Sequence, residues 1–290
     1  MSPATLAFLL GTGLAWSSLD ALRKQLGAHL DALTIMLQLS ALQIPFFGIW
    51  LLSDGWPSVQ SAFWLPSLSV IALNLAASLL FLRAVQISEL SRTVPYLSLT
   101  PIFTVGAEAL MLARWPSEVQ TIGIALVLVG AVLLNLRQLR AGQIDRGSLY
   151  MIIVALIWSF TPVMDKLATD ASSVPFHGAS QQLGITLLLM LWVALKGRLR
   201  RTFSQSWPHA SMLTLTALAA TAAMGLQLLT LQVALASVME AVKRAVGLVM
   251  AMILGHLVFK ERLSLGKWLA AALMGVGTTL VLEIWGQAPG

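Results

Sequence analysis

The chain has 290 residues, of which 58% are hydrophobic and only 10% are charged, and its mean hydropathy is +0.84. Because soluble domains carry about 25% charged residues, this composition excludes a water-soluble domain. The net charge of +6 does not indicate a nucleic-acid partner, since the basic residues lie in short segments between apolar runs. The chain has no cysteine, which excludes disulfides, thiol nucleophiles and thiolate metal sites.

The apolar residues form runs long enough for a helix to cross the hydrocarbon core of a membrane, which takes roughly 20 residues. Breaking the sequence at proline, glycine and charge clusters predicts ten spans, near 3–22, 32–52, 62–82, 93–112, 119–136, 149–168, 174–195, 211–235, 238–259 and 266–285. The first span has no basic region and no small-residue cleavage site of a signal peptide, so a helix is expected there. Neither charge nor proline marks the boundary between the eighth and ninth spans, around Ala236 and Ser237.

Two motifs occur twice along the chain. The copies are 142 and 147 residues apart: Trp16-Ser17 with Lys24 matches Trp158-Ser159 with Lys166, and 113–117 matches 260–264. This recurrence indicates a duplication into the halves 1–140 and 141–290. Since each half has an odd number of spans, the second must be inverted relative to the first. The sequence therefore predicts an all-α integral membrane protein with ten transmembrane helices as two inverted five-helix repeats, an arrangement of secondary transporters whose substrate site lies near the midplane.

The Lys and Arg residues gather on one side of the predicted spans. Fourteen of the 18 lie in the segments after the odd-numbered spans: Arg23, Lys24, Arg83, Arg92, Arg137, Arg140, Arg146, Lys196, Arg198, Arg200, Arg201, Lys260, Arg262 and Lys267. The opposite side has only Arg114 and Lys166, while Lys243 and Arg244 lie inside the ninth span. Because cytoplasmic loops carry the excess of Lys and Arg, both termini are expected outside the cytoplasm, in a bacterial inner (plasma) membrane.

The ten spans in two repeats, the Trp-Ser opening at Trp16 and Trp158, and the stretch 259–264 leading to Gly275 and Gly277 resemble the EamA-type branch of the drug/metabolite transporter superfamily over the whole chain. The resemblance implies that 1–140 and 141–290 are EamA-like repeats. It also implies secondary transport, often export, of amino acids, nucleosides, sugars, amines or drugs, through a cavity lined mainly by spans one, three, four, six, eight and nine. Two features depart from the family: Arg114 occupies the first-half position of Glu261, and many relatives have cytoplasmic termini.

Three charged residues lie in the otherwise apolar ninth span: Glu240, Lys243 and Arg244. Charges inside a span cost several kcal/mol unless they are paired or face a wet cavity. The spacings of three and four residues place all three on one helix face, so Glu240 can neutralise one cation. The remaining cation would suit an anionic or zwitterionic substrate group. The alternative is a cluster that extends to the membrane interface and only sets topology.

The 147-residue offset makes Tyr96 and Thr93 the first-half counterparts of Lys243 and Glu240, so Tyr96 is expected on the uncharged wall of the cavity. Pro95 and Pro101 in the same span remove backbone donors, which either frees carbonyls toward the cavity or only kinks the helix.

Further candidates are aromatic or amide residues within spans. Trp16 and Trp158 could stack on the substrate or anchor the chain at the membrane interface. Asn74 and Gln227 could bind substrate, although hydrogen bonding between helices is favoured.

Some ionisable residues within spans could carry a coupled proton. For Asp20 and Asp165, pairing with a nearby Lys or Arg is favoured over this role. Glu108 and His256 lie near span ends, so neither is expected to carry the proton alone. Gly123, Gly130, Gly275 and Gly277 predict close packing of the fifth and tenth spans.

The sequence thus favours a secondary transporter that moves a small polar or amphipathic metabolite, amino-acid-like or otherwise anionic or zwitterionic, by alternating access. A flippase of a lipid-like anion, which would need a lateral opening between helices, and a multidrug exporter are the alternatives. No phosphate-binding loop, zinc-ligand cluster or Ser, His and Asp arrangement is recognisable, so no enzyme activity and no cofactor are expected. The expected partners are a small-molecule substrate, the lipid bilayer and, as a candidate, a coupled proton. The sequence does not predict an oligomeric state.

Overall fold

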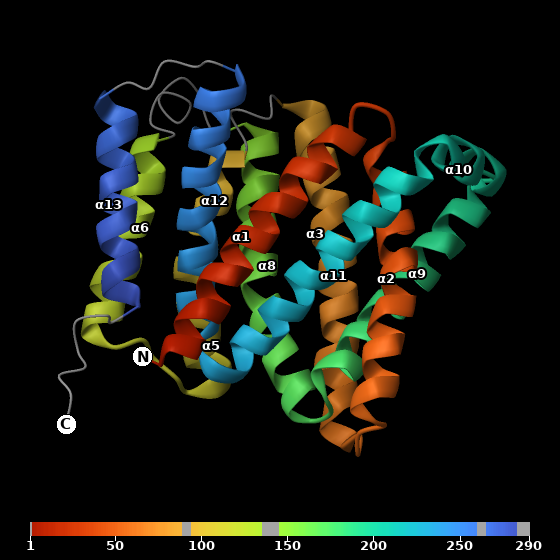
Figure 1. Ribbon diagram of the computed structural model, residues 1–290, viewed down its shortest axis with the longest axis horizontal. Coiled ribbons are helices and arrows are strands. Elements are labelled where there is room, and N and C mark those ends of the chain that lie inside the picture. Colours follow the sequence, from red (N-terminus) through yellow and green to blue (C-terminus); the bar gives the residue numbers. More distant parts are fainter. Residues whose placement is uncertain (1, 89–93, 135–144, 260–264, 283–290) are drawn as a thin grey trace. The chain divides into compact units, whose positions relative to one another are not determined.

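The computed structural model describes residues 2–88, 94–134, 145–259 and 265–282, and within these ranges every regular element is a helix (Figure 1). The first half contributes α1 Pro3–Leu26, α2 Ala32–Asp54, η1 Ser61–Phe63, α3 Trp64–Ile87, η2 Val94–Leu99, α5 Thr100–Leu112 and α6 Glu118–Leu134. The second contributes α8 Arg146–Asp170, α9 Val174–Leu195, α10 Leu199–Ser206, η3 Trp207–His209, α11 Ala210–Val233, α12 Ala236–Phe259 and α13 Leu265–Val281. The all-α prediction is confirmed for these residues.

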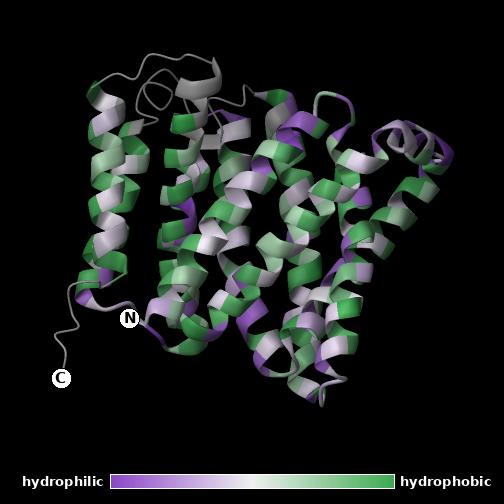
Figure 2. Ribbon diagram, in the orientation of Figure 1, coloured by the Kyte–Doolittle hydropathy of each residue, from purple (hydrophilic) through white to green (hydrophobic). Residues whose placement is uncertain are grey.

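Six helical stretches within the described ranges are long and apolar enough to cross a membrane: α1, α2, Ser61–Ala84, α8, α9 and Leu199–Val233. Shorter apolar helices lie at Tyr96–Leu112, Glu118–Leu133 and Trp268–Val281. Hydrophobic residues predominate along the helices, and hydrophilic ones lie chiefly at helix ends and in connections (Figure 2). Each predicted span overlaps a helix. That all ten cross the bilayer stays a prediction.

The segment between the seventh and eighth spans contains a short helix, α10, that the sequence did not predict. Arg200 and Arg201 are exposed on it, whereas Thr202 and Ser206 are buried. A helix with one basic face and one buried face suits the boundary between a membrane and water. Two of the basic residues counted for the topology, Arg200 and Arg201, therefore lie on helix α10 rather than in an irregular loop.

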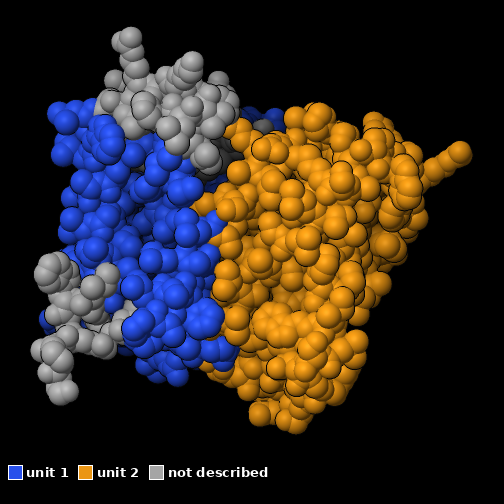
Figure 3. Space-filling view, viewed as in Figure 1, with its two compact units in different colours: residues 1–14, 73–163, 230–290 blue, residues 15–72, 164–229 orange. Residues whose placement is uncertain are grey.

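The chain folds into two compact units, and each draws on both halves of the sequence (Figure 3). Unit 1 comprises Met1–Leu14, Leu73–Val163 and Thr230–Gly290, and unit 2 comprises Ala15–Ala72 and Met164–Leu229. The two units are therefore not the two predicted repeats. A compact unit is defined by contacts in space, whereas a repeat is defined by similarity between two parts of the sequence.

Within unit 1, α6 and α13 lie side by side (Figure 1). A Cβ added to Gly123 would lie 2.6 Å from the carbonyl oxygen of Gly277, and one added to Gly130 would lie 2.8 Å from that of Ala270. Only glycine lets the two backbones approach so closely. The predicted close packing is confirmed for Gly123, Gly130 and Gly277. It is wrong for Gly275, where an added Cβ would meet nothing within 4 Å.

Within unit 2, α2 pairs with α9. Gly178 lies against the ring of Phe47, since a Cβ there would lie 2.4 Å from Phe47 Cε1. One turn along each helix, Gln43 Nε2 donates to Gln182 Oε1 at 3.4 Å. Side-chain amides thus join these two helices, which is a common use of polar residues between membrane helices.

Candidate functional site

Helix α12 begins after a short break at Ala234 and Leu235, and its first turn is capped by Glu108 of α5. Glu108 Oε1 accepts a hydrogen bond from the backbone N–H of Ala236 at 2.6 Å. Its Oε2 accepts from the N–H and the hydroxyl of Ser237, at 3.0 and 2.5 Å. A helix start leaves N–H groups without intrahelical partners and carries a partial positive charge, so a carboxylate satisfies both needs. Glu108 is 2% exposed, and this contact is internal to unit 1.

The predicted charge cluster follows one turn after this cap. Lys243 Nζ donates to Glu240 Oε1, so the pairing expected from the spacing of three residues is present. Glu240 is 3% exposed, while the side chains of Lys243 and Arg244 are half-buried. Together the three residues carry one net positive formal charge on the first three turns of α12.

The sequence does not indicate Glu108 as a partner of this helix, because 128 residues separate it from Ala236. A signal was present nonetheless. The sequence between the eighth and ninth spans offers no acidic residue before Glu240, yet backbone groups at membrane depth need partners. An isolated acidic residue in another span is the natural source of such a cap.

Tyr96 and Trp158 lie against the same hydrophobic cluster in unit 1, formed by Ala77, Ala84, Leu97, Met151, Val154 and Ala155. The Trp158 ring also lies 5.9 Å from that of Phe81. Asn74 is half-buried on α3. Tyr96 belongs to the 3-10 turn η2, which leads directly into α5. Short 3-10 turns of this kind are frequent at the ends of α-helices.

Pro101 lies in the first turn of α5, where a proline removes no helical hydrogen bond, so it does not kink the helix. Pro95 lies within η2. Thr93, the predicted counterpart of Glu240, lies outside the described residues.

The other two predicted residues belong to unit 2. Trp16 packs beside Leu19, Ala220 and Ala223, and the Arg23 guanidinium lies 5.6 Å above its ring, a cation–π contact. Gln227 is 8% exposed on α11. Unit 1 thus holds six of the predicted site residues and unit 2 holds Trp16 and Gln227. Their convergence on one cavity stays a prediction.

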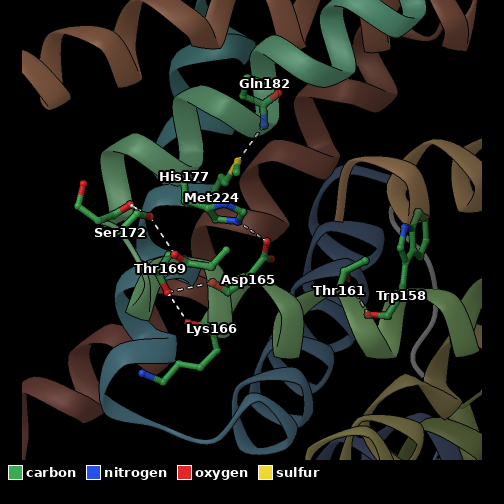
Figure 4. Close-up of polar contacts among 11 residues, drawn as sticks. Trp158, Thr161, Asp165, Lys166, Thr169, Ser172, His177, Gln182 and Met224 are labelled. Carbon is green, nitrogen blue, oxygen red and sulfur yellow. Dashed lines mark hydrogen bonds and ion pairs between the residues drawn. The ribbon is translucent and has the colours of Figure 1, made fainter. Parts of the chain in front are cut away.

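The two aspartates of the predicted spans differ in their partners. Asp20 lies 3.8 Å from Arg23, as expected. The expectation for Asp165 is wrong, because its Oδ1 lies 2.8 Å from His177 Nε2 (Figure 4). The adjacent Lys166 contacts Asp170 instead, at 2.5 Å. Neighbouring residues on a helix do not face each other, which is why Lys166 cannot serve Asp165. His256 lies in the C-terminal part of α12, and its side chain lies outside the described residues.

A groove of ≈330 Å³ lies on unit 2 between α2 and α11. Its walls include Phe46, Trp50, Leu218, Gly225, Leu226 and Leu229, so it is apolar. Gln227 is not among the lining residues. Among the residues whose positions are described, no group of three His, Asp or Glu side chains could hold a metal ion.

Long apolar helices, buried intramembrane charges and helix pairs joined by glycine define a polytopic membrane protein. A family model described as the EamA-like transporter family matches residues 4–136 and 145–283. The chain therefore belongs to the EamA-like transporter family and is a membrane transporter of the drug/metabolite type.

One solved structure, titled only "Crystal structure of protein", is similar in fold, with a TM-score of 0.76 and 15% sequence identity over 98% of each chain. Among curated proteins, none matches the chain.

Proposed function

We propose that the protein is a secondary transporter that moves a small polar or amphipathic metabolite, amino-acid-like or otherwise anionic or zwitterionic, across a bacterial inner membrane by alternating access. The observation that carries the proposal is the cluster of Glu240, Lys243 and Arg244 at the start of α12, beside Glu108. Three ionisable groups on α12 and a fourth, Glu108, at its N-terminus from α5 exceed what helix packing requires, since each is expensive to place within a membrane helix.

The charged groups of this cluster have different neighbours. Glu108 faces the partial positive charge of the α12 N-terminus and three hydrogen-bond donors. Glu240 is in contact with Lys243. Arg244 adds a second cation on the next residue, and a guanidinium can bind a carboxylate or phosphate through two parallel hydrogen bonds. The cluster therefore supports an anionic or zwitterionic substrate over an apolar one.

A ligand screen tests the substrate class. Purified protein is heated with single compounds from amino acids, organic acids, sugars, nucleosides and lipophilic cations, and its melting temperature is recorded. A ligand that binds the folded state at 100 times its Kd adds about 2.7 kcal/mol of stability. We expect stabilisation by carboxylate-bearing compounds in the wild type and its loss in Arg244→Gln. The matched control is Arg198→Gln, which removes an exposed cation before α10. Stabilisation by lipophilic cations alone would favour the multidrug exporter.

The apolar groove between α2 and α11 favours a second candidate, a flippase of a lipid-like anion, because an acyl chain fits an apolar groove on a membrane helix pair. A lipid substrate would enter the groove laterally from one leaflet of the bilayer. The purified protein would then move it to the other leaflet in liposomes. A fluorescent anionic phospholipid that crosses leaflets with wild-type protein, but not with Arg244→Gln, would support this candidate over a soluble metabolite.

A further inference from the structure

A second ionisable pair, this one buried, lies in unit 2, whereas the α12 cluster belongs to unit 1. His177 is fully buried in the first turn of α9, and Asp165 is 3% exposed near the end of α8 (Figure 4). His177 Nε2 and Asp165 Oδ1 are 2.8 Å apart. The ring of Phe63 stands edge-on to the imidazole at 6.0 Å between centroids. The pair is therefore shielded from solvent and lies beside an aromatic ring.

The local fold holds this pair in place. Three residues, 171–173, connect α8 to α9, and the side chain of Ser173 caps α9 by accepting from the N–H of Phe176. The N–H of His177 donates to the carbonyl oxygen of Ser173 at 2.9 Å. The imidazole thus starts one helical turn into α9 and faces back to α8. An aliphatic contact would hold α8 against α9 without the free-energy cost of burying a carboxylate. Stabilising this helix pair therefore does not explain why a histidine and an aspartate lie here.

The second ring nitrogen is the informative atom. His177 Nδ1 is buried and has no hydrogen-bond partner among the described residues. With Asp165 ionised, Nε2 carries the proton that faces the carboxylate, which leaves the lone pair of Nδ1 open. In this state the buried pair has one net negative charge. One proton bound at Nδ1 gives an imidazolium beside a carboxylate, and the pair becomes neutral.

Other charged groups on the surrounding elements do not contact the pair in the described part of the chain. On α8, Lys166 and Asp170 contact each other, while Arg146 and Tyr150 lie at the opposite end of the helix. No other ionisable residue occurs on α9 or η1. Asp54, at the end of α2, is exposed.

The distance from the helix end bears on proton access. Asp165 precedes the last residue of α8 by five positions, which is about 7–8 Å along the helix axis. A proton therefore needs to cross only a short depth of protein to reach the pair from that end.

We infer that the His177–Asp165 pair is a proton-binding site and that proton binding at Nδ1 couples transport to a proton gradient. The coupling role rests on the proposed function, whereas proton binding does not. The step forms one N–H bond at Nδ1, with the proton delivered by hydronium, which becomes water, and it reverses by return of the same proton to water. Asp165 holds the imidazolium through Nε2–H and exchanges no proton itself.

Nuclear magnetic resonance of protein with 15N-labelled histidine in liposomes tests proton binding directly, because 15N shifts distinguish neutral from doubly protonated imidazole. The His177 signals are assigned as those missing from His177→Gln. We expect Nδ1 to be unprotonated at pH 8 and both nitrogens to be protonated at pH 5. In Asp165→Asn the imidazolium signal should be lost over this range, whereas in Asp170→Asn it should remain. A His177 ring in one protonation state from pH 5 to 8 in wild-type protein would overturn the proposal.

Should His177→Gln fail to fold, Asp165→Asn still identifies the signal as the imidazolium signal that this variant loses. Asp165→Asn should fold, because its amide oxygen keeps the hydrogen bond from Nε2–H. If that variant also fails, the pH-dependent signal is assigned by its distance-dependent coupling to 13C-labelled aspartate in wild-type protein.

Proteoliposomes loaded with a pH-sensitive dye test coupling, with an equimolar mixture of the twenty protein amino acids as the probe. A carrier that has lost its proton site still exchanges substrate across the membrane but no longer accumulates it along a pH gradient. We expect Asp165→Asn to keep exchange within about twofold of wild type and to lose gradient-driven accumulation. Equal accumulation by both proteins overturns coupling. If wild-type protein moves none of the probe, the substrate proposal fails and the titration alone decides the proton site.

Discussion

Glu108 and Asp165 are both buried carboxylates on membrane helices, but they have different tasks. Glu108 accepts three hydrogen bonds from the first turn of α12, so its ionised form is bound to the backbone. Asp165 contacts a titratable ring, so its environment can change with one proton. Glu108 therefore caps a helix, whereas Asp165 holds the ring of a histidine from the next helix.

Replacing Glu108 by Gln should destabilise the protein. The amide retains one acceptor oxygen but points an NH2 donor at the N–H groups of α12, and it removes the charge that faces the helix dipole. The expected loss is about 1–3 kcal/mol, seen as a lower melting temperature in detergent. Glu118→Gln is the matched control, because Glu118 is exposed in the first turn of α6. Equal melting temperatures for the two variants would show that the cap does not stabilise α12.

Glu240→Gln should lower stability more than Lys243→Gln. The first substitution leaves Lys243 and Arg244 as adjacent half-buried cations, whereas the second removes one of them. Breaking a buried pair by deleting one partner costs roughly 3 kcal/mol or more. Melting temperatures of the two variants check the order, and a larger drop for Lys243→Gln would contradict it.

At the scale of elements, the sequence predicted most helices because a membrane span must be both long and apolar. It also predicted the Glu240–Lys243 contact, since a spacing of three residues places both on one face. It did not predict the start of α12 at Ala236, the turn η2 or the pairing of Asp165 with His177. Each of these depends on a group from another helix or on backbone geometry. The hydrophobic periodicity of the sequence reports neither of them. His177 gave no signal because a single histidine near a span end resembles many structural ones.

The seam between α6 and α13 offers a matched pair of glycines two residues apart. Gly277→Ala should lower the stability of the protein by about 1–3 kcal/mol, because its Cβ would lie 2.7 Å from the carbonyl oxygen of Gly123. Relieving this contact requires a backbone shift, which costs free energy. Gly275→Ala should be neutral or stabilise by up to about 1 kcal/mol, since its Cβ meets open space and alanine favours helix. Thermal unfolding distinguishes the two, and equal effects would contradict the seam.

At the scale of the whole molecule, the units and the family matches divide the chain differently. The family model matches each half of the sequence once, whereas each compact unit contains helices from both halves. Interleaving of this kind is what an inverted repeat produces when corresponding helices of the two halves pack together.

The membrane orientation follows from the distribution of Lys and Arg and is open to a direct test. A reporter fused after Gly290 should behave as external, and one inserted near Arg198 and Arg200 should behave as cytoplasmic. Alkaline phosphatase and a fluorescent protein, which are active on opposite sides of the inner membrane, provide the paired readout. Cytoplasmic signals from the Gly290 fusion and external signals from the other would reverse the orientation.

Transport by charge-neutralised α12 variants shows whether the α12 cations bind the substrate. Purified Lys243→Gln, Arg244→Gln and the control Arg198→Gln are reconstituted, and uptake of the ligand that most stabilises the wild type is measured. Loss of a charge-assisted hydrogen bond to the substrate weakens binding by about 1.5–3 kcal/mol, or roughly tenfold to a hundredfold. We expect this loss for Arg244→Gln or Lys243→Gln in folded protein and wild-type uptake for Arg198→Gln. Wild-type uptake by all three variants would contradict an anion site on α12.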